Sequence, residues 1–253
     1  GMPTNPLLEQ SSMGCKVLCL GPVSYEMRKI RRYTESQSMP YKEKSQYDEF
    51  QFISIMSHNA GIPKIIIDGA MEFHKIISEN SRFRTLNREG ILAASLYVAC
   101  RVNNVPRSAK EIAVIFKLDN ASASKGCKMA LHILNSLETN MENNEQTHYG
   151  ETTPQCFMER FCCKLNINAE LTKLSLFVAH KITKDNLMPE NNPQSIASSI
   201  IYFISQICKL NITKTQIKQI SGTSEVTINQ CYKKLNLLKA KLIPNMILEK
   251  YAD

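Results

Sequence analysis

The segment from residue 211 to residue 235 carries the side chains best suited to bind another molecule. It reads NITKTQIKQISGTSEVTINQCYKKL. Ile217 and Ile220 predict the buried side of a short helix, and Gly222 supplies the positive φ that a tight turn needs. Ser224 is a typical capping residue at the start of a second helix. Two short helices joined by such a turn predict a helix-turn-helix motif.

In this motif the first turn of the second helix faces base edges in the major groove of DNA. Val226 and the methyl group of Thr227 are suited to contact a thymine methyl group, and Asn229 is suited to pair with adenine. Lys233 and Lys234 would reach phosphates further along the groove. The predicted DNA-contacting residues of this segment are Ser224, Val226, Thr227, Asn229 and Lys233. A helix pair used only for packing is the alternative.

The rest of the chain lacks the residue patterns of catalysis or metal binding. Five histidines are scattered without a carboxylate or thiol at a telling spacing, and there is no glycine-rich phosphate loop. Nine cysteines, an odd number, indicate free thiols in a reducing intracellular compartment. Cys15 and Cys19 have near-ligand spacing, but no second pair completes a zinc site. We therefore expect no enzyme activity, no metal and no cofactor in this chain.

A shift of 105 residues superimposes apolar residues in the same order, which predicts two copies of one domain. The matched pairs are Phe52 and Phe157, Ile62 and Ile167, Ile77 and Ile182, Ile91 and Ile196, Tyr97 and Tyr202, Ile112 and Ile217, and Ile115 and Ile220. After a slip of one residue, Cys127 would match Cys231 and Leu131 would match Leu235. The first copy lacks the turn glycine of the helix-turn-helix.

Apolar residues at helical spacing, without strand-like alternation, predict an all-α fold of two tandem five-helix domains. Ser108 and Glu111 form a predicted capping box. In the first copy we expect helices around residues 52–56, 66–77 and 92–102, after residue 108, and at 121–138. In the second copy we expect them at 154–164, 168–186, 194–208, 213–220 and 224–239.

Charge and composition divide the chain into four parts. Lys and Arg (31) outnumber Asp and Glu (23), and the net charge of +8 favours phosphate-bearing or acidic partners. No apolar run reaches the ~18 residues that cross a bilayer, so we expect no membrane association. The expected parts are a mobile basic segment at 1–47, a first repeat at 48–138, a linker at 139–150 and a second repeat at 151–253.

Several stretches resemble transcription factor IIB. Residues 96–101 (LYVACR) and 105–112 (VPRSAKEI) are similar to the first cyclin-like repeat of this family. Residues 221–233 (SGTSEVTINQCYK) are similar to the helix-turn-helix of its second repeat, and 152–162 to the start of that repeat. Residues 5–8 (NPLL) resemble the connector after the family's zinc ribbon, which we expect N-terminal to this chain. The chain looks most like the version found in large cytoplasmic DNA viruses.

The resemblance implies a general initiation factor. Such a protein binds the TATA-binding protein on promoter DNA kinked by ~80° and recruits RNA polymerase. It would act as a monomer in the nucleus, or in the host cytoplasm if it is viral. The resemblance also implies that residues 1–46, with Arg28, Lys29, Arg31 and Arg32, thread toward the polymerase cleft.

Residue roles in the first repeat follow from the same resemblance. Arg84 and Arg88 would lie in a loop near the minor groove, with Arg107 as a further DNA contact. The implied contacts to the TATA-binding protein are Arg101, Lys117 and Lys128. In the second repeat, Asn229 stands where the family commonly has an arginine that reads guanine, which speaks against recognition of a G·C-rich element.

Two other functions are compatible with these patterns. A cyclin that regulates a kinase would share the helical repeats, but it needs neither a helix-turn-helix nor a basic surplus. A helix-turn-helix repressor would bind DNA alone and usually dimerise.

Overall fold

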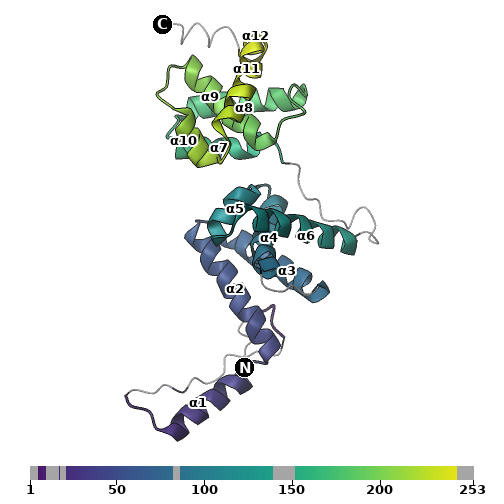
Figure 1. The fold of residues 1–253 in the computed structure, drawn as a ribbon, viewed down its shortest axis with the longest axis vertical. Helices are drawn as coiled ribbons and strands as arrows, with labels where there is room; N and C mark the ends of the chain where they lie inside the picture. Colours follow the sequence, from purple (N-terminus) through teal and green to yellow (C-terminus); the bar gives the residue numbers. More distant parts are fainter. Residues whose placement is uncertain (1–4, 10–16, 18–20, 82–85, 139–151, 244–253) are drawn as a thin grey trace. The chain divides into compact units, whose positions relative to one another are not determined.

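The structure is a computed structural model that describes residues 5–9, 17, 21–81, 86–138 and 152–243. These residues form helices joined by turns, and they contain no strand (Figure 1). None of the described helices is long and apolar enough to cross a membrane. The predicted all-α fold is confirmed.

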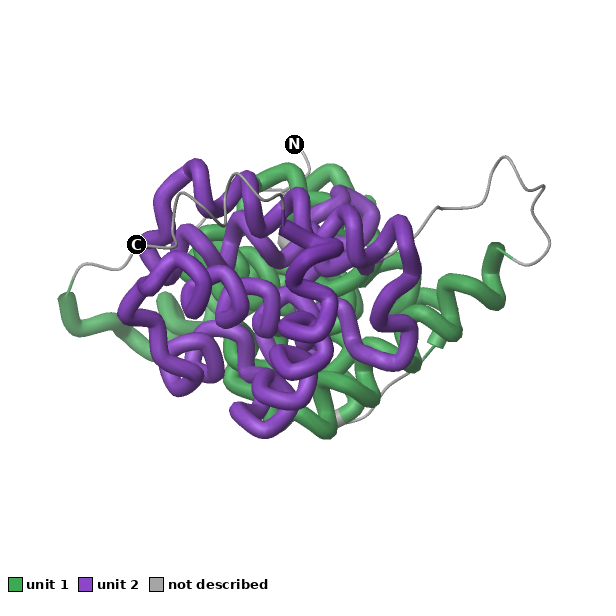
Figure 2. The backbone as a smooth tube through the Cα atoms, turned by 90° about the horizontal axis from the view of Figure 1, so that it is seen from above, with its two compact units in different colours: residues 1–100, 112–147 green, residues 101–111, 148–253 purple. Residues whose placement is uncertain are grey.

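The chain forms two compact units, coloured separately in Figure 2. The first contains residues 1–100 and 112–147, and the second contains residues 101–111 and 148–253. The short segment 101–111 is therefore grouped with the second unit, although the repeat pattern assigns it to the first copy.

Six helices precede the predicted linker. They are α1 (Tyr25–Ser38), α2 (Tyr41–Asn59), α3 (Lys64–Asn80), α4 (Leu86–Val102), α5 (Ala109–Phe116) and α6 (Asn120–Glu138). The last five are the helices predicted for the first repeat. Because α2 runs unbroken across residue 47, the predicted boundary there needs correction, and residues 41–47 belong to the first helix of the repeat.

Helix α1 was not expected, since residues 1–47 were predicted to be a mobile basic segment. Ser24 caps it by accepting a hydrogen bond from the Met27 N–H at 3.3 Å. Its apolar side chains, including Ile30 and Tyr33, are exposed, so the helix buries no apolar stripe among the described residues. The mobility predicted for this segment stays a prediction.

The second repeat contains the five predicted helices and one more short helix. They are α7 (Gln155–Lys164), α8 (Ala169–Lys184), α9 (Pro193–Ile207), α10 (Lys214–Ser221), α11 (Glu225–Leu237) and α12 (Lys239–Leu242). Hydrogen bonds from side chains cap four of these helices at Asn168, Asn192, Thr213 and Ser224. The described residues end at 243, one residue after α12.

The two repeats keep a spacing of 105 residues through their turns as well as their helices. Helix α5 shifted by 105 residues coincides with α10, and α6 and α11 begin 105 residues apart. Three pairs of residues with positive φ have the same spacing, and they are Gly61 and Asn166, Asn104 and Lys209, and Lys117 and Gly222. Since positive φ is uncommon outside glycine, three such coincidences support two copies of one backbone.

This constant spacing corrects the predicted slip of one residue. The buried positions Ala123, Gly126 and Ala130 of α6 correspond to Ile228, Cys231 and Leu235 of α11. Cys231 is thus the counterpart of Gly126 rather than of Cys127. Cys127 is also buried, and its identity to Cys231 suggested a false register.

Each repeat surrounds a central helix, α4 in the first and α9 in the second. Leu96 and Ala99 of α4 and Ile200 and Phe203 of α9 are fully buried. As predicted, Tyr97 and Tyr202 occupy equivalent places, and each packs against the core of its repeat.

A close contact between backbones distinguishes the first core. Gly126 of α6 packs against Gly90 of α4 so closely that a Cβ on Gly126 would lie 2.2 Å from the Gly90 carbonyl oxygen. The second repeat has a cysteine, Cys231, in place of Gly126.

Candidate nucleic-acid interface

The predicted helix-turn-helix is formed by α10, a turn and α11. Thr213 and Gln216 make a capping box at the start of α10. Gly222 follows the helix with a φ of 68°, and its N–H donates to the Lys218 carbonyl oxygen at 2.8 Å. Ser224 caps α11 by accepting from the Thr227 N–H at 3.2 Å. The turn glycine and the cap have the roles predicted for them.

Helix α11, the second helix of the motif and its predicted recognition helix, has one buried face and one exposed face. Ile228, Cys231 and Leu235 are fully buried in the core of the second repeat. Val226, in the first turn, is 67% exposed. An apolar side chain this exposed contributes little to packing in its own repeat, so it is available to a partner such as a thymine methyl group.

Hydrogen bonds engage several polar groups of this helix. Lys214 Nζ donates to Asn229 Oδ1 at 3.0 Å, and Lys218 Nζ lies 3.3 Å from Glu225 Oε1. The hydroxyl oxygens of Ser224 and Thr227 are 2.8 Å apart. The Lys218 ion pair offsets the negative charge of Glu225, which would otherwise oppose the approach of a phosphate backbone.

The two lysines predicted to contact phosphate differ in their surroundings. Lys233 is exposed on α11. Lys234 donates to Asn191 Oδ1 at 3.3 Å and lies 3.6 Å from a Glu190 carboxylate oxygen. Lys233 is therefore the better candidate for phosphate contact.

The first repeat has the same corner between α5 and α6, with Lys117 in place of the turn glycine. Lys117 has a φ of 56°, and the next N–H, of Leu118, donates to the Ala113 carbonyl oxygen at 2.9 Å. Asp119 caps α6 by accepting from the Ser122 N–H at 2.8 Å. A bond from the second residue beyond the helix to a carbonyl in its last turn is the Schellman pattern. The turn therefore forms without glycine.

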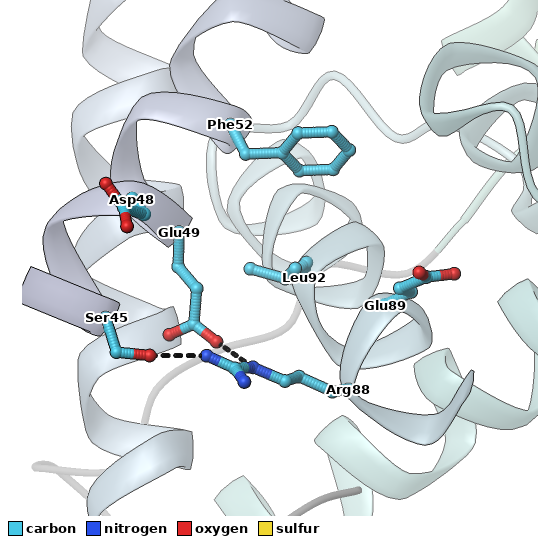
Figure 3. A pocket seen from close by; sticks show the side chains of 7 residues that line it. All are labelled: Ser45, Asp48, Glu49, Phe52, Arg88, Glu89 and Leu92. Atoms are coloured by element: carbon cyan, nitrogen blue, oxygen red, sulfur yellow. Dashed lines mark hydrogen bonds and ion pairs between the residues drawn. The ribbon is translucent and has the colours of Figure 1, made fainter. Parts of the chain in front are cut away.

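Arg88 lies on a helix and not in the predicted loop. It is in the first turns of α4, where its Nε donates to Glu49 and its Nη2 donates to Ser45 Oγ at 2.6 Å (Figure 3). These groups line a surface pocket of about 450 Å³ together with Asp48, Phe52, Glu89 and Leu92. The location given by the resemblance is corrected, because α4 begins at Leu86 and includes Arg88. The Glu49 carboxylate of α2 holds the guanidinium group at this pocket. Its predicted contact with DNA stays a prediction.

Glu49 also links Arg88 to a buried histidine for which the sequence indicated no partner. His74 of α3 is 2% exposed, and its Nε2 lies 3.0 Å from Glu49 Oε2. Ser95 Oγ of α4 lies 3.4 Å from His74 Nδ1. Burial tends to raise the pKa of Glu49, but the hydrogen bonds from His74 and Arg88 outweigh burial and hold this pKa below its usual value. No local spacing signals this network, since Glu49 and His74 are 25 residues apart.

The remaining predicted site residues have the following positions. Arg84 lies outside the described residues. Arg101 and Arg107 are half-buried, and Lys117 and Lys128 are exposed. The basic residues Arg28, Lys29, Arg31 and Arg32 are exposed on α1. Their roles toward DNA, the TATA-binding protein or polymerase stay predictions.

Comparisons with known proteins agree with this geometry. The sequence model "Transcription factor TFIIB repeat" matches residues 42–130 and 147–237, which include all or most of each of the five main helices of each repeat. Its two matches begin 105 residues apart, as the turns do.

Individual relatives carry the same family name. A transcription initiation factor IIB-like protein of Acanthamoeba polyphaga mimivirus is 31% identical over 93% of this chain and 52% of its own length. Transcription initiation factor IIB of Drosophila melanogaster is 28% identical over 96% and 74%, and that of Homo sapiens 27% identical over 92% and 71%. The chain thus spans about half the length of the viral relative.

Among solved structures, a chain of the yeast RNA Pol II CTD kinase CTDK-1 complex is 16% identical over 85% of this chain and 72% of its own, with a TM-score of 0.34. A similarity this low supports no conclusion on fold or function. The match of the repeat model to most of the chain, by contrast, shows that this protein belongs to the transcription factor IIB family.

Proposed function

We propose that this chain acts as a transcription initiation factor that binds promoter DNA together with the TATA-binding protein and recruits RNA polymerase. Membership in the family supports the general role. The exposed first turn of α11, presented by a capped helix-turn-helix, is the observation that carries the DNA-binding part. The site of action would be the nucleus or, for a viral protein, the host cytoplasm.

The two repeats would divide the work of binding. In the second repeat, Val226 and Lys233 offer an apolar contact and a phosphate contact on the open face of α11. In the first repeat, Lys117 at the corresponding turn and Lys128 on α6 are exposed and would face an acidic partner surface. Charge complementarity of this kind accelerates association and selects partners.

The first test is whether the purified chain shifts a complex of TATA-binding protein and promoter DNA at physiological salt. We expect a slower-migrating complex that the chain does not form on DNA alone at the same concentration. A chain that instead co-purifies with a kinase and leaves the complex unshifted would contradict the proposal and favour a cyclin.

The second test addresses the basic corner of the first repeat. Lys117→Glu and Lys128→Glu should weaken assembly about tenfold each or more, because like charges would then face the acidic partner. Lys125→Glu is a matched control, since Lys125 is exposed on α6, as Lys128 is, and has no assigned role. Equal effects of all three changes, with unchanged circular dichroism, would contradict the assignment of this surface.

A further inference from the structure

The contact between Lys214 and Asn229 fixes what the recognition helix can offer to a base. Lys214 is the first residue of α10, and its Nζ donates to Asn229 Oδ1 at 3.0 Å. The same ammonium group lies 5.1 Å from the ring centroid of Tyr202, which is in edge contact with Tyr232 at 5.0 Å. A cation above an aromatic ring is attracted to it, so the ring helps to hold the lysine beside Asn229.

The lysine also determines the orientation of the Asn229 amide group. An ammonium group has only donors, whereas an amide has one acceptor oxygen and one donor nitrogen. The oxygen must therefore face Lys214, because the reversed amide would place two donors against each other. The donors left to a partner are the Nδ2 hydrogens of Asn229 and the remaining hydrogens of Lys214 Nζ. The second lone pair of Asn229 Oδ1 lies beside a positive charge, which disfavours its use by another donor.

The position of Lys214 is unfavourable for the helix that carries it. A positive charge in the first turn of a helix opposes the helix dipole. The equivalent of Lys214 in the first repeat is Ala109, and the equivalent of Asn229 is Ser124. The pair is thus specific to the repeat whose recognition helix has an exposed valine.

We propose that Lys214 and Asn229 act as one donor unit that selects guanine at one base pair of the upstream major groove, with Lys214 as a specificity-determining residue. The inference rests on the proposed function, in which α11 enters this groove. Guanine presents two acceptors there, N7 and O6, and both suit a positively charged unit with free donor hydrogens.

Adenine fits the same unit poorly. The usual asparagine–adenine pair needs Asn229 Oδ1 to accept from the adenine amino group while Nδ2 donates to N7. Here Oδ1 already accepts from an ammonium group, and the positive charge 3.0 Å away repels the amino hydrogens. The contact thus reverses the expectation from the sequence that Asn229 reads adenine, and it replaces the missing arginine with two side chains.

The experiment is selection from a promoter library with random bases upstream of the TATA element, bound by the full chain together with TATA-binding protein. The wild-type chain should enrich guanine over adenine at one position by about tenfold, the discrimination typical of a good base contact. Lys214→Met keeps an aliphatic stem beside Tyr202 but removes the charge, so it frees Asn229 Oδ1. This variant should lose the guanine preference and enrich adenine at that position.

Lys218→Met is the matched control. Lys218 is on the same helix and pairs with Glu225, so this variant also loses one positive charge. It should bind more weakly at all sequences and select the same bases as the wild type. Thermal melting followed by circular dichroism verifies that both variants are folded.

The outcomes separate the inference from the proposed function. If the wild type selects adenine, or if Lys214→Met selects the same base as the wild type, the inference is overturned although the chain binds promoter DNA. If the wild type retains no DNA from the library, both the proposed function and the inference fail.

Discussion

The two repeats share a backbone but build their cores differently at three equivalent positions. In the first repeat Glu49, His74 and Ser95 form a polar network across three helices. The counterparts 105 residues later are Pro154, Ala179 and Ile200. These three residues are buried. One copy therefore stabilises its central helix with buried hydrogen bonds, and the other does so with apolar contacts.

The comparison shows which features of this fold are kept between the two copies and which can change. Two caps and three left-handed turn residues recur at the same spacing in both copies, while the side chains between helices change in polarity and size. Apolar burial needs only a matching volume, whereas a buried carboxylate needs hydrogen-bond partners. Changes in the first core should therefore have larger effects than changes at the equivalent positions of the second.

The largest effect is expected for Gly126→Ala. The new Cβ would lie 2.2 Å from the Gly90 carbonyl oxygen, so α4 and α6 must move apart. We expect a loss of at least about 3 kcal/mol in the free energy of unfolding, at the upper end of overpacking effects. Urea unfolding followed by circular dichroism measures this loss.

Gly69→Ala is the matched control in the same repeat. Its Cβ would lie 4.0 Å from the Ala99 Cβ, which is an ordinary contact, and alanine favours helix over glycine by about 0.5–1 kcal/mol. This variant should be as stable as the wild type or more stable. A similar loss in both variants would show that the contact between Gly90 and Gly126 is not special.

The second prediction concerns acid. Because the pKa of Glu49 is lowered in the folded state, its contribution is present above its unfolded pKa of about 4.5 and is lost as the pH falls through the lower folded value. Glu49→Gln should lower the stability of the first repeat by about 1–3 kcal/mol at neutral pH and flatten its acid dependence below about pH 4.5.

Hydrogen exchange read separately on α4 and α9 tests this prediction. Protection of α4 should fall in acid in the wild type and change less in Glu49→Gln. Protection of α9 serves as the internal reference, since its repeat has a proline in place of Glu49. An α4 whose acid dependence is the same in both proteins would refute the role of the network.

Smaller effects on stability, opposite in sign, are expected at the turn between α5 and α6 and at the turn between α10 and α11. Lys117 and Gly222 both have positive φ, which costs a residue with a side chain about 1 kcal/mol relative to glycine. Lys117→Gly should therefore stabilise the first repeat by about 1 kcal/mol, and Gly222→Lys should destabilise the second by a similar amount. Thermal melting of both variants measures the pair, and two shifts of the same sign would contradict it.

The smallest effect on stability is expected at Lys128 and Lys233, which are equivalent and exposed. Either change to alanine should alter the free energy of unfolding by less than about 0.5 kcal/mol. Lys233→Ala should lower affinity for all DNA sequences alike and reduce the salt slope of DNA binding by about 1. Lys128→Ala should leave this slope unchanged if the residue faces protein. Equal salt slopes of DNA binding in the two variants would contradict the division of roles between the repeats.

The sequence was sufficient for the ten main helices because each has an apolar stripe or a cap. The capping box of Ser108 and Glu111 was visible as a pair three residues apart, and in the structure the Glu111 N–H donates to Ser108 Oγ at 3.3 Å. Helix α1 also has a cap, Ser24, but the resemblance implied a mobile segment at these residues, so no helix was expected there.

Features that depend on tertiary structure were not predictable in the same way. Arg88 and Glu49 are 39 residues apart, and only the packing of α4 against α2 makes them partners. The left-handed Lys117 has no signal of its own, since lysine does not favour that conformation. The contact between Lys214 and Asn229 likewise needs the turn at Gly222 to bring two helices together.

The equal spacing of the left-handed residues also makes parts of the two copies interchangeable in length. Gly61–Lys117 and Asn166–Gly222 span the same number of residues, so a chimera with residues 167–221 in place of 62–116 would need no loop redesign. Two neighbours outside the exchanged segment limit such a chimera. Glu49 would face Ala179 and Pro193 instead of His74 and Arg88, and Gly126 would face Ser195 instead of Gly90. Ala179→His, Pro193→Arg and Ser195→Gly would restore these three partners in an exchanged segment.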